Sequence, residues 1–262
     1  MIQALINNQW ETISTESLQL GADTFAFETG LYETFRTLDF KPVFLEPHLD
    51  RLFRSVKLTG LTIHYKRGEI LEMVETVISN FDDPNQRTRI LAVPDKLILY
   101  TSSLNLDPAI YNGVSAITVK GTRETPNVKT TNYKVCYDAW QLAESKKCFE
   151  AILIDKDGLV LEGSRSNIFW AKTGKLYTRE GGVLPGVTRQ TILSQSPFPV
   201  EFGQLNQDEF ETVDELFLTN SGSGVVPIIQ VNEQTIGDGS IGEKTSQLVS
   251  QYNDWMHADF KQ

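Results

Sequence analysis

The sequence is poor in cysteine and histidine. Its 262 residues include two cysteines and three histidines. Two cysteines make no disulfide framework in a chain of this length, so we expect Cys136 and Cys148 to be reduced thiols. His48, His64 and His257 lack the spacing of metal ligands and have no cysteine pair beside them. We therefore expect no metal site.

Long apolar runs and an excess of positive charge are also missing. No run approaches the roughly 20 apolar residues of a membrane helix, and residues 1–5 do not begin a signal peptide. We therefore expect a cytoplasmic protein. Lys and Arg number 24 against 34 Asp and Glu, for a net charge of −10. Such an acidic surface repels nucleic acid and anionic lipid, so neither is an expected partner.

The common nucleotide and hydrolase motifs are absent too. The chain contains no Gly-x-Gly-x-x-Gly, no Gly-x-Ser-x-Gly and no Gly-Lys-Ser/Thr after the Gly/Ser-rich segment 221–224. Dinucleotide binding, ATP hydrolysis and a serine-hydrolase elbow are therefore disfavoured.

The apolar and charged residues that are present indicate a globular α+β protein. Hydrophobic residues make up 40% of the chain, enough for a large core. The polar stretch 122–131 suggests a boundary between two subdomains, 1–121 and 122–262. Apolar periodicity predicts the following elements. The strands are 3–6, 10–13, 31–37, 42–45, 88–93, 96–101, 114–119, 151–154, 159–161, 168–171, 175–177 and 215–218. The helices are 48–56, 68–81, 135–145 (with Ala139, Leu142 and Ala143 inward), 187–194 and 243–260.

Four segments could carry chemistry. In segment 182–189, glycines and a proline precede a helix whose first N–H groups suit a phosphate. In segment 219–224, a strand ends in hydroxyls and glycines, whose successive N–H groups can form an anion nest. Glu162 lies between two apolar strands, where a partly buried carboxylate needs a partner. Segment 127–134 holds Lys129 and Lys134 just before a helix. Each segment alone is also compatible with an ordinary turn or a solvated surface.

Taken together, these segments resemble the class IV aminotransferases, the fold type IV pyridoxal-phosphate enzymes. That family includes branched-chain aminotransferase, D-amino acid aminotransferase and aminodeoxychorismate lyase. The resemblance covers nearly the whole chain. The matching motifs are Gly30-Leu31-Tyr32-Glu33-Thr34-Phe35-Arg36, His48-Leu49-Asp50-Arg51-Leu52, Lys129-Thr130-Thr131-Asn132-Tyr133, Glu162-Gly163-Ser164-Arg165-Ser166-Asn167-Ile168-Phe169 and Leu184-Pro185-Gly186-Val187-Thr188-Arg189.

The resemblance implies a role for several residues. Lys129 matches the catalytic lysine that forms a Schiff base with pyridoxal 5'-phosphate, and Lys134 lies out of register with the Asn-Tyr pair. Glu162 matches the carboxylate that faces the pyridine nitrogen, and Tyr133 matches a tyrosine near the ring hydroxyl. The residues that match phosphate ligands are Arg51, Val187, Thr188 and Ser221.

The substrate site is less well defined. Glu28-Thr29-Gly30 replaces the Gly-Asp-Gly common in the family, and segment 87–101 is short and lacks an Arg-Gly turn. Relatives use that region for the substrate pocket. Candidate pocket residues are Tyr32, Arg36, Arg89 and Gly222, for which salt-bridge, core or turn roles are equally compatible with the sequence.

Three functions follow from the resemblance. Tyr133 favours an aminotransferase that moves an amino group between an amino acid and a 2-oxo acid. The short length favours aminodeoxychorismate lyase, which releases pyruvate and 4-aminobenzoate. The altered segments leave room for a non-enzymatic cofactor binder, although the presence of Lys129 and Glu162 argues against it. The resemblance also implies a homodimer.

Overall fold

A computed structural model describes residues 1–260, and they divide into two compact units. Unit 1 contains Met1–Asn105 and Val128–Lys134, together with the described residues from Asp259 onward. Unit 2 contains Leu106–Asn127 and Val135–Ala258. The chain first passes from unit 1 to unit 2 after Asn105. It returns to unit 1 at Val128–Lys134, where this segment hydrogen-bonds to residues 30–32.

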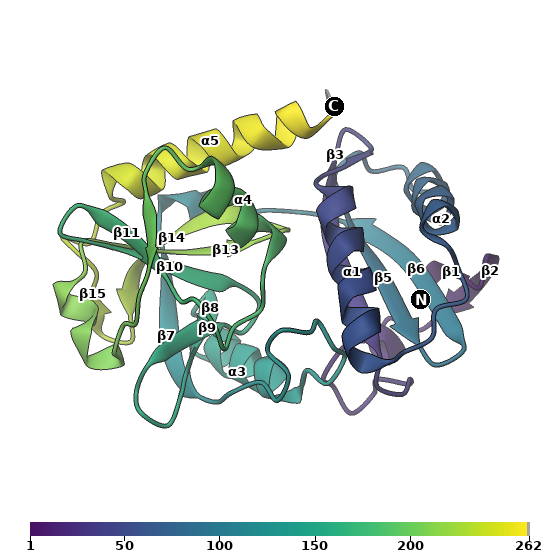
Figure 1. Ribbon diagram of the computed structural model, residues 1–262, viewed down its shortest axis with the longest axis horizontal. Coiled ribbons are helices and arrows are strands. Elements are labelled where there is room, and N and C mark those ends of the chain that lie inside the picture. The colour runs from purple at the N-terminus through teal and green to yellow at the C-terminus, as the bar shows by residue number, and fades with distance from the viewer. Residues whose placement is uncertain (261–262) are drawn as a thin grey trace. The chain divides into compact units, whose positions relative to one another are not determined.

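Unit 1 is an antiparallel sheet with two helices (Figure 1). The strand order is β2-β1-β6-β5-β3-β4. Its elements are β1 (Ile2–Ile6), β2 (Gln9–Ile13), a 3-10 turn (Glu16–Leu18), β3 (Leu31–Leu38), β4 (Lys41–Pro42), α1 (Leu45–Thr59), α2 (Arg67–Ser79), β5 (Gln86–Val93) and β6 (Lys96–Ser103).

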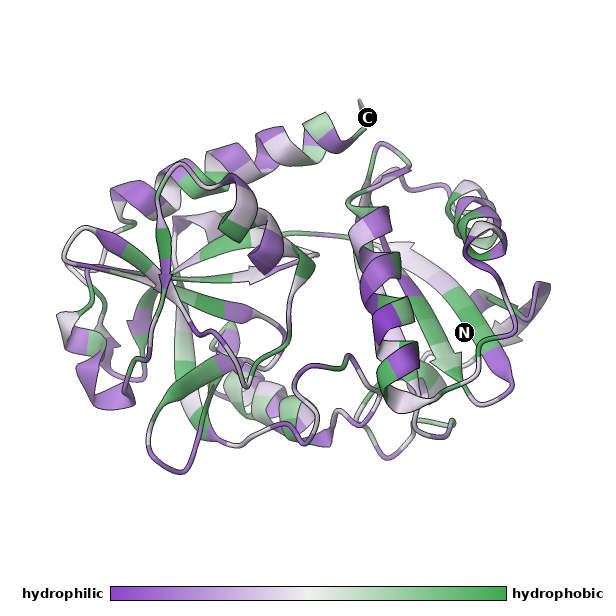
Figure 2. Ribbon diagram, in the orientation of Figure 1, coloured by the Kyte–Doolittle hydropathy of each residue, from purple (hydrophilic) through white to green (hydrophobic). Residues whose placement is uncertain are grey.

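The two helices of unit 1 cover one face of its sheet. Leu49 and Leu52 of α1 and Val74 of α2 share a buried cluster with Phe35 and Ile90 of the strands. In the ribbon of Figure 2, hydrophilic residues colour most of the visible side of α1, as its apolar spacing predicts. Because side chains alternate along a strand, the intervening residues of β3 belong to the opposite face of the sheet.

Unit 2 is a curved mixed sheet with three α-helices. The strand order is β12-β11-β10-β13-β14-β7-β8-β9, with β15 on β14. Its elements are a 3-10 turn (Pro108–Asn112), β7 (Val114–Lys120), α3 (Lys134–Ser145), β8 (Glu150–Ile154), β9 (Val160–Gly163), β10 (Asn167–Lys172), β11 (Lys175–Thr178), α4 (Val187–Gln195), β12 (Val200–Phe202), a 3-10 turn (Gln207–Thr212), β13 (Glu215–Asn220), β14 (Gly224–Val231), β15 (Gln234–Thr235) and α5 (Glu243–Asp259). The first residue of α3, Lys134, belongs to unit 1.

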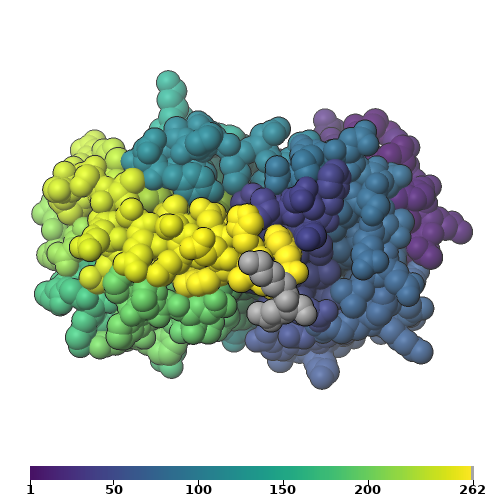
Figure 3. All heavy atoms as spheres, turned by 90° about the horizontal axis from the view of Figure 1, so that it is seen from above, coloured from purple at the N-terminus to yellow at the C-terminus, as the bar shows by residue number. Residues whose placement is uncertain are grey.

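The helices of unit 2 lie against this sheet. α3 joins the parallel strands β7 and β8, and α4 contacts β13. α5 buries one face that includes Leu248 and Tyr252 and leaves the other exposed, as the yellow surface in Figure 3 shows. Among the described residues, no helix is both long and apolar enough to cross a membrane.

The α+β class is confirmed, and most predicted elements are present. Two local predictions were wrong. The strand 42–45 is reduced to Lys41–Pro42, because α1 already begins at Leu45. Leu142 of α3 is 43% exposed, whereas Ala139 and Ala143 are buried. The strands β12, β14 and β15 were not predicted. Cys136 and Cys148 are both free thiols.

Candidate functional site

Arg51 lies at the centre of a buried polar cluster in unit 1. Its Nε donates to Glu33 Oε1 at 2.8 Å and its Nη2 to Glu33 Oε2 at 2.6 Å. His48 Nδ1 is 2.7 Å from Glu33 Oε2. The spacing of three residues brings His48 and Arg51 to one face of α1, against Glu33 of β3. All three side chains are buried. A forked ion pair of this kind fixes the plane of the guanidinium.

Electrostatics keeps Glu33 charged. Burial acts to raise the pKa of its carboxyl, but the Arg51 guanidinium outweighs burial and lowers the pKa to about 2. Burial also lowers the pKa of His48, and the positive charges of Arg51 and Lys129 act in the same direction against the attraction of Glu33. A neutral His48 therefore donates its Nδ1 proton to Glu33.

The Lys129 segment is hydrogen-bonded to the start of β3. Tyr32 N–H donates to the Lys129 carbonyl and Thr131 N–H donates to the Gly30 carbonyl, both at 2.9 Å. Thr131 Oγ1 accepts from Gly30 N–H at 2.8 Å. Lys129 Nζ lies 4.5 Å from the centre of the Tyr32 ring, and Tyr133 packs edge-on against the same ring. Lys129 is half-buried, whereas Lys134 is exposed at the start of α3.

Candidate substrate residues lie beside this lysine on the strands of unit 1. Arg89 Nε donates to Thr34 Oγ1 at 3.2 Å, and its Nη1 donates to Tyr100 Oη at 3.1 Å. The guanidinium also lies over the Tyr32 ring. Arg36 is two residues beyond Thr34 on β3, so strand alternation places it on the face of Tyr32.

Glu162 is a buried carboxylate of unit 2. It is 4% exposed at the end of β9. Its Oε2 accepts from Leu184 N–H at 3.0 Å, and its Oε1 is 3.4 Å from Arg123 Nη1. Arg189 also interacts electrostatically with it. Both arginines therefore place positive charge near this carboxylate.

A second buried carboxylate, that of Glu150, organises the turn after Glu162. It accepts hydrogen bonds from Ser164 Oγ at 2.5 Å, Ser166 Oγ at 2.9 Å and Ala151 N–H at 2.9 Å. A Cβ on Gly163 would overlap Ser166 Oγ. The turn is therefore compact only because residue 163 is glycine.

The start of α4 is tied to the same turn. Asn167 Nδ2 donates to the Leu184 carbonyl at 2.8 Å. Gly186 is the N-cap of α4, and in the described part of the chain this helix start has no side-chain capping hydrogen bond. Val187 and Thr188 therefore begin a helix with orphan N–H groups in its first turn. The Thr188 hydroxyl is 3.1 Å from Tyr252 Oη.

In segment 219–224, where an anion nest was expected, two of the backbone N–H groups already donate to a side chain of the same segment. Gly222 N–H and Ser223 N–H both donate to Asn220 Oδ1, at 2.9 and 2.8 Å. Beside them, the buried hydroxyl of Thr219 has no hydrogen-bond partner among residues 1–260. Ser221 is half-buried in the turn between β13 and β14.

Within each unit, the predicted site residues lie close to further polar residues to which the sequence analysis assigned no role. These are Glu33 and His48 in unit 1 and Arg123, Glu150 and Asn167 in unit 2. Glu33, His48 and Asn167 were inside quoted motifs, so the motifs already contained the signal. Glu150 and Arg123 stood outside them, in a strand start and a polar loop.

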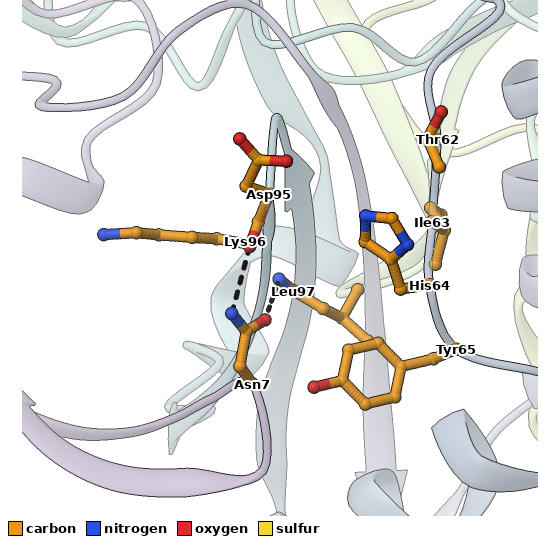
Figure 4. Close-up of a pocket in the computed structure, with 8 residues that line it drawn as sticks. All are labelled: Asn7, Thr62, Ile63, His64, Tyr65, Asp95, Lys96 and Leu97. Carbon is orange, nitrogen blue, oxygen red and sulfur yellow. Dashed lines mark hydrogen bonds between the residues drawn. The ribbon is translucent and has the colours of Figure 1, made fainter.

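A small hollow in unit 1 is unrelated to these residues. Figure 4 shows it between Asn7, the segment 62–65 and the turn at Asp95. The Asn7 side chain donates to the Asp95 carbonyl and accepts from Leu97 N–H. The cavity volume is about 10 Å³, which is space for a single water molecule. No predicted site residue lines it.

The family model for class IV amino-transferases matches residues 30–231, the stretch that contains all the predicted site residues. The chain belongs to the class IV aminotransferases. Members of this family are pyridoxal-phosphate enzymes. A branched-chain-amino-acid aminotransferase of Pseudomonas aeruginosa is 30% identical over 94% of this chain and 89% of its own length.

Other relatives carry different names. A D-alanine aminotransferase of Bacillus licheniformis is 29% identical over 86% of each chain. An aminodeoxychorismate lyase of Bacillus subtilis is 28% identical over 86% of this chain and 84% of its own. Among solved structures, a putative branched-chain amino acid aminotransferase from Thermotoga maritima superposes with a TM-score of 0.83 at 26% identity, over 98% of this chain and 96% of that one.

The residues fit pyridoxal phosphate. The uncapped start of α4 and the unpartnered Thr219 hydroxyl are donors suited to a phosphate ester. These two groups of donors lie near each other within unit 2. Thr219 of β13 is the strand partner of Asn167 of β10, and the Asn167 side chain donates to the loop that precedes α4. In unit 2, Glu162 is a buried carboxylate of the type that pairs with a protonated ring nitrogen. In unit 1, Lys129 carries an amine of the type that condenses with an aldehyde.

Proposed function

We propose that this class IV enzyme is an aminotransferase that moves an amino group between an amino acid and a 2-oxo acid. One observation most strongly supports the pyridoxal-phosphate site on which this proposal rests. Leu184 N–H links the buried Glu162 carboxylate to the loop that begins α4. Unit 2 therefore joins an acceptor for a protonated ring to donors for a phosphate, and pyridoxal phosphate carries both groups.

Lys129 is the residue that we propose to bind the cofactor aldehyde as a Schiff base. Its amine acts as a nucleophile only when unprotonated, and once released from the cofactor it serves as the base for the substrate Cα proton. The Tyr32 ring, against which Tyr133 packs edge-on, lies 4.5 Å from its Nζ and restricts its side chain. Bound pyridoxal phosphate supplies an electron sink. Glu162, through its negative charge, holds a proton at the ring nitrogen.

Phosphate binding is assigned to Arg51, the N–H groups of Val187 and Thr188, and the Ser221 hydroxyl. For the substrate, we propose that Arg89 and Arg36 attract a carboxylate beside Tyr32, with Gly222 allowing close approach. These assignments, a cytoplasmic location, a homodimer and subdomains split at 121 and 122 remain predictions.

The Lys129 assignment is tested by borohydride reduction of the holoenzyme. We expect a yellow protein in which peptide mapping places the reduced cofactor on Lys129. Lys134→Ala is the matched control, because this exposed lysine is five residues away. It should leave the labelling unchanged, whereas Lys129→Ala should abolish it. An adduct on Lys134 would contradict the assignment.

Aminodeoxychorismate lyase is the second candidate, favoured by the Bacillus subtilis relative. A paired assay separates the two. Glutamate formed from 2-oxoglutarate with a panel of amino acids marks the aminotransferase, and pyruvate released from aminodeoxychorismate marks the lyase. If the cofactor-loaded protein showed neither of these activities, the result would favour a cofactor-binding protein without catalysis.

A further inference from the structure

Leu184 occupies an unusual position in unit 2. It lies in the loop between β11 and α4, outside any helix or strand. Its N–H donates to Glu162 Oε2 at 3.0 Å, and its carbonyl accepts from Asn167 Nδ2 at 2.8 Å. The two side chains thus hold this residue through both of its backbone polar groups. Such bonds determine the path of a loop that has no ladder of its own.

The two side chains are themselves held rigidly. Glu162 ends β9 and Asn167 begins β10, and Gly163 N–H donates to the Ser166 carbonyl at 2.8 Å between them. Glu150 hydrogen-bonds both serines of this turn. Asn167 is 4% exposed, so its amide is oriented by the protein and not by solvent.

Close packing links Asn167 to the first residue before α4. A Cβ built on Gly186 would overlap Asn167 Oδ1. The backbone of Gly186 is extended, with φ of −62° and ψ of 142°, which any residue adopts. Glycine is therefore required here by the Asn167 side chain and not by backbone conformation.

We propose that Asn167 is a positioning residue for phosphate binding. It holds the segment 184–186 so that the N–H groups of Val187 and Thr188 stay at a fixed place relative to the Glu162 carboxylate. The inference rests on the proposed function, in which these two ends of the site bind the phosphate and the ring nitrogen of one cofactor. Asn167 touches neither group in this role and acts through Leu184 and Gly186.

The test measures how much the phosphate contributes to binding. Dissociation constants of pyridoxal phosphate and of pyridoxal, which lacks the phosphate, are measured with the cofactor-free protein. For Asn167→Ala, we expect the preference for pyridoxal phosphate over pyridoxal to fall about tenfold, the loss of roughly one charge-assisted hydrogen bond. A role in stability alone would weaken both ligands equally and would leave the preference unchanged.

Two further variants sharpen the test. Asn232→Ala is the control, since the Asn232 side chain also hydrogen-bonds a backbone group of unit 2, the Thr118 N–H, and in addition donates to the Thr118 hydroxyl. It should keep the preference within about twofold. Gly186→Ala should lower the preference as Asn167→Ala does, because it displaces the same amide. In the double variant Asn167→Ala/Gly186→Ala, the new methyl group has no amide to overlap. The double variant should therefore lose less of the preference than the two single variants together.

Three results would overturn the inference: an unchanged preference in Asn167→Ala, an unchanged preference in Gly186→Ala, or fully additive losses. Failure of the proposed function has a different signature. In that case the unaltered protein itself would show no preference for pyridoxal phosphate, and borohydride would leave Lys129 unlabelled.

Discussion

At the scale of single residues, buried charges in this protein occur with partners. Arg51 is the proposed phosphate ligand, yet most of its described hydrogen bonds go to Glu33. Glu162 is the proposed ring-nitrogen partner, yet it lies beside Arg123 and under the field of Arg189. The same charges therefore contribute to folding and to binding, and substitutions must be chosen to separate the two.

Arg51→Ala should affect both properties. It should weaken pyridoxal phosphate about tenfold or more, because a charge-assisted hydrogen bond is lost. It should also destabilise the fold by about 3–5 kcal/mol, since Glu33 is left buried without its main counter-charge. Arg54→Ala is the control one turn along α1. Binding titrations and urea denaturation check the two effects, and equal losses for both variants would contradict the role of Arg51.

Glu162→Gln should separate binding from turnover. An isosteric amide keeps an oxygen that can accept from Leu184 N–H, so the fold and cofactor affinity should be retained. The variant loses the negative charge that holds a proton on the ring, so kcat should fall while KM changes little. Steady-state kinetics on the cofactor-saturated variant are the measurement. A kcat within about twofold, a barrier change of only ~0.4 kcal/mol, would exclude this role.

At the scale of elements, the local pattern of apolar residues was sufficient to predict a helix or strand wherever one face of that element is apolar. α1 and α2 were found from spacing, and so were the hairpins around residues 7 and 173. The strand β14 was not predicted because Pro227 lies in its middle, and proline is uncommon inside a strand. Its apolar residues also follow Gly224 directly, which is typical of a loop. Leu142 was placed inward by spacing alone, although the small Ala139 and Ala143 face the sheet.

The start of β3 offers a test at this scale. A Cβ on Gly30 would overlap the Ala92 carbonyl of β5, so Gly30→Ala should force the backbones apart. We expect this variant to be destabilised and to bind the cofactor poorly, because Gly30 also bonds the Lys129 segment. In Gly68→Ala, the added methyl meets nothing within 4 Å. This change in α2 should be neutral or stabilising by about 0.5–1 kcal/mol. Thermal unfolding of both variants would show the contrast, and equal effects would contradict it.

At the scale of the whole molecule, stability should depend on pH through the Glu33–His48–Arg51 cluster. The pKa of His48 is lowered on folding, so its contribution is complete above about pH 6.5 and declines as pH falls below that value. The pKa of Glu33 is lowered from 4.5 to about 2, so its contribution is lost between these two pH values. Acid should therefore destabilise the protein in two steps.

Urea denaturation between pH 7.5 and 3 measures this dependence. His48→Gln should remove the first step, whose slope is at most about 1.4 kcal/mol per pH unit. The exposed His64 provides the control variant, His64→Gln, which should retain that step. A slope that is the same in both variants would assign the first step to other groups.

The sequence by itself determined the family, the elements and the types of residue at the candidate site. Motif residues such as Glu162 and Arg51 stand at characteristic spacings, and apolar periodicity reports which face of an element is buried. Both signals are local, because they depend on residues within a few turns or strands of each other.

Only the tertiary structure decided which of these residues meet. Thr131 binds Gly30 across 101 positions of the chain, and this bond returns Lys129 to unit 1. The Glu33–Arg51 pair and the hold of Asn167 on Leu184 likewise join separate elements. Their geometry follows from strand register and close packing, which no local pattern encodes. The sequence therefore indicates which residue types the site uses, and the fold determines how each one is held.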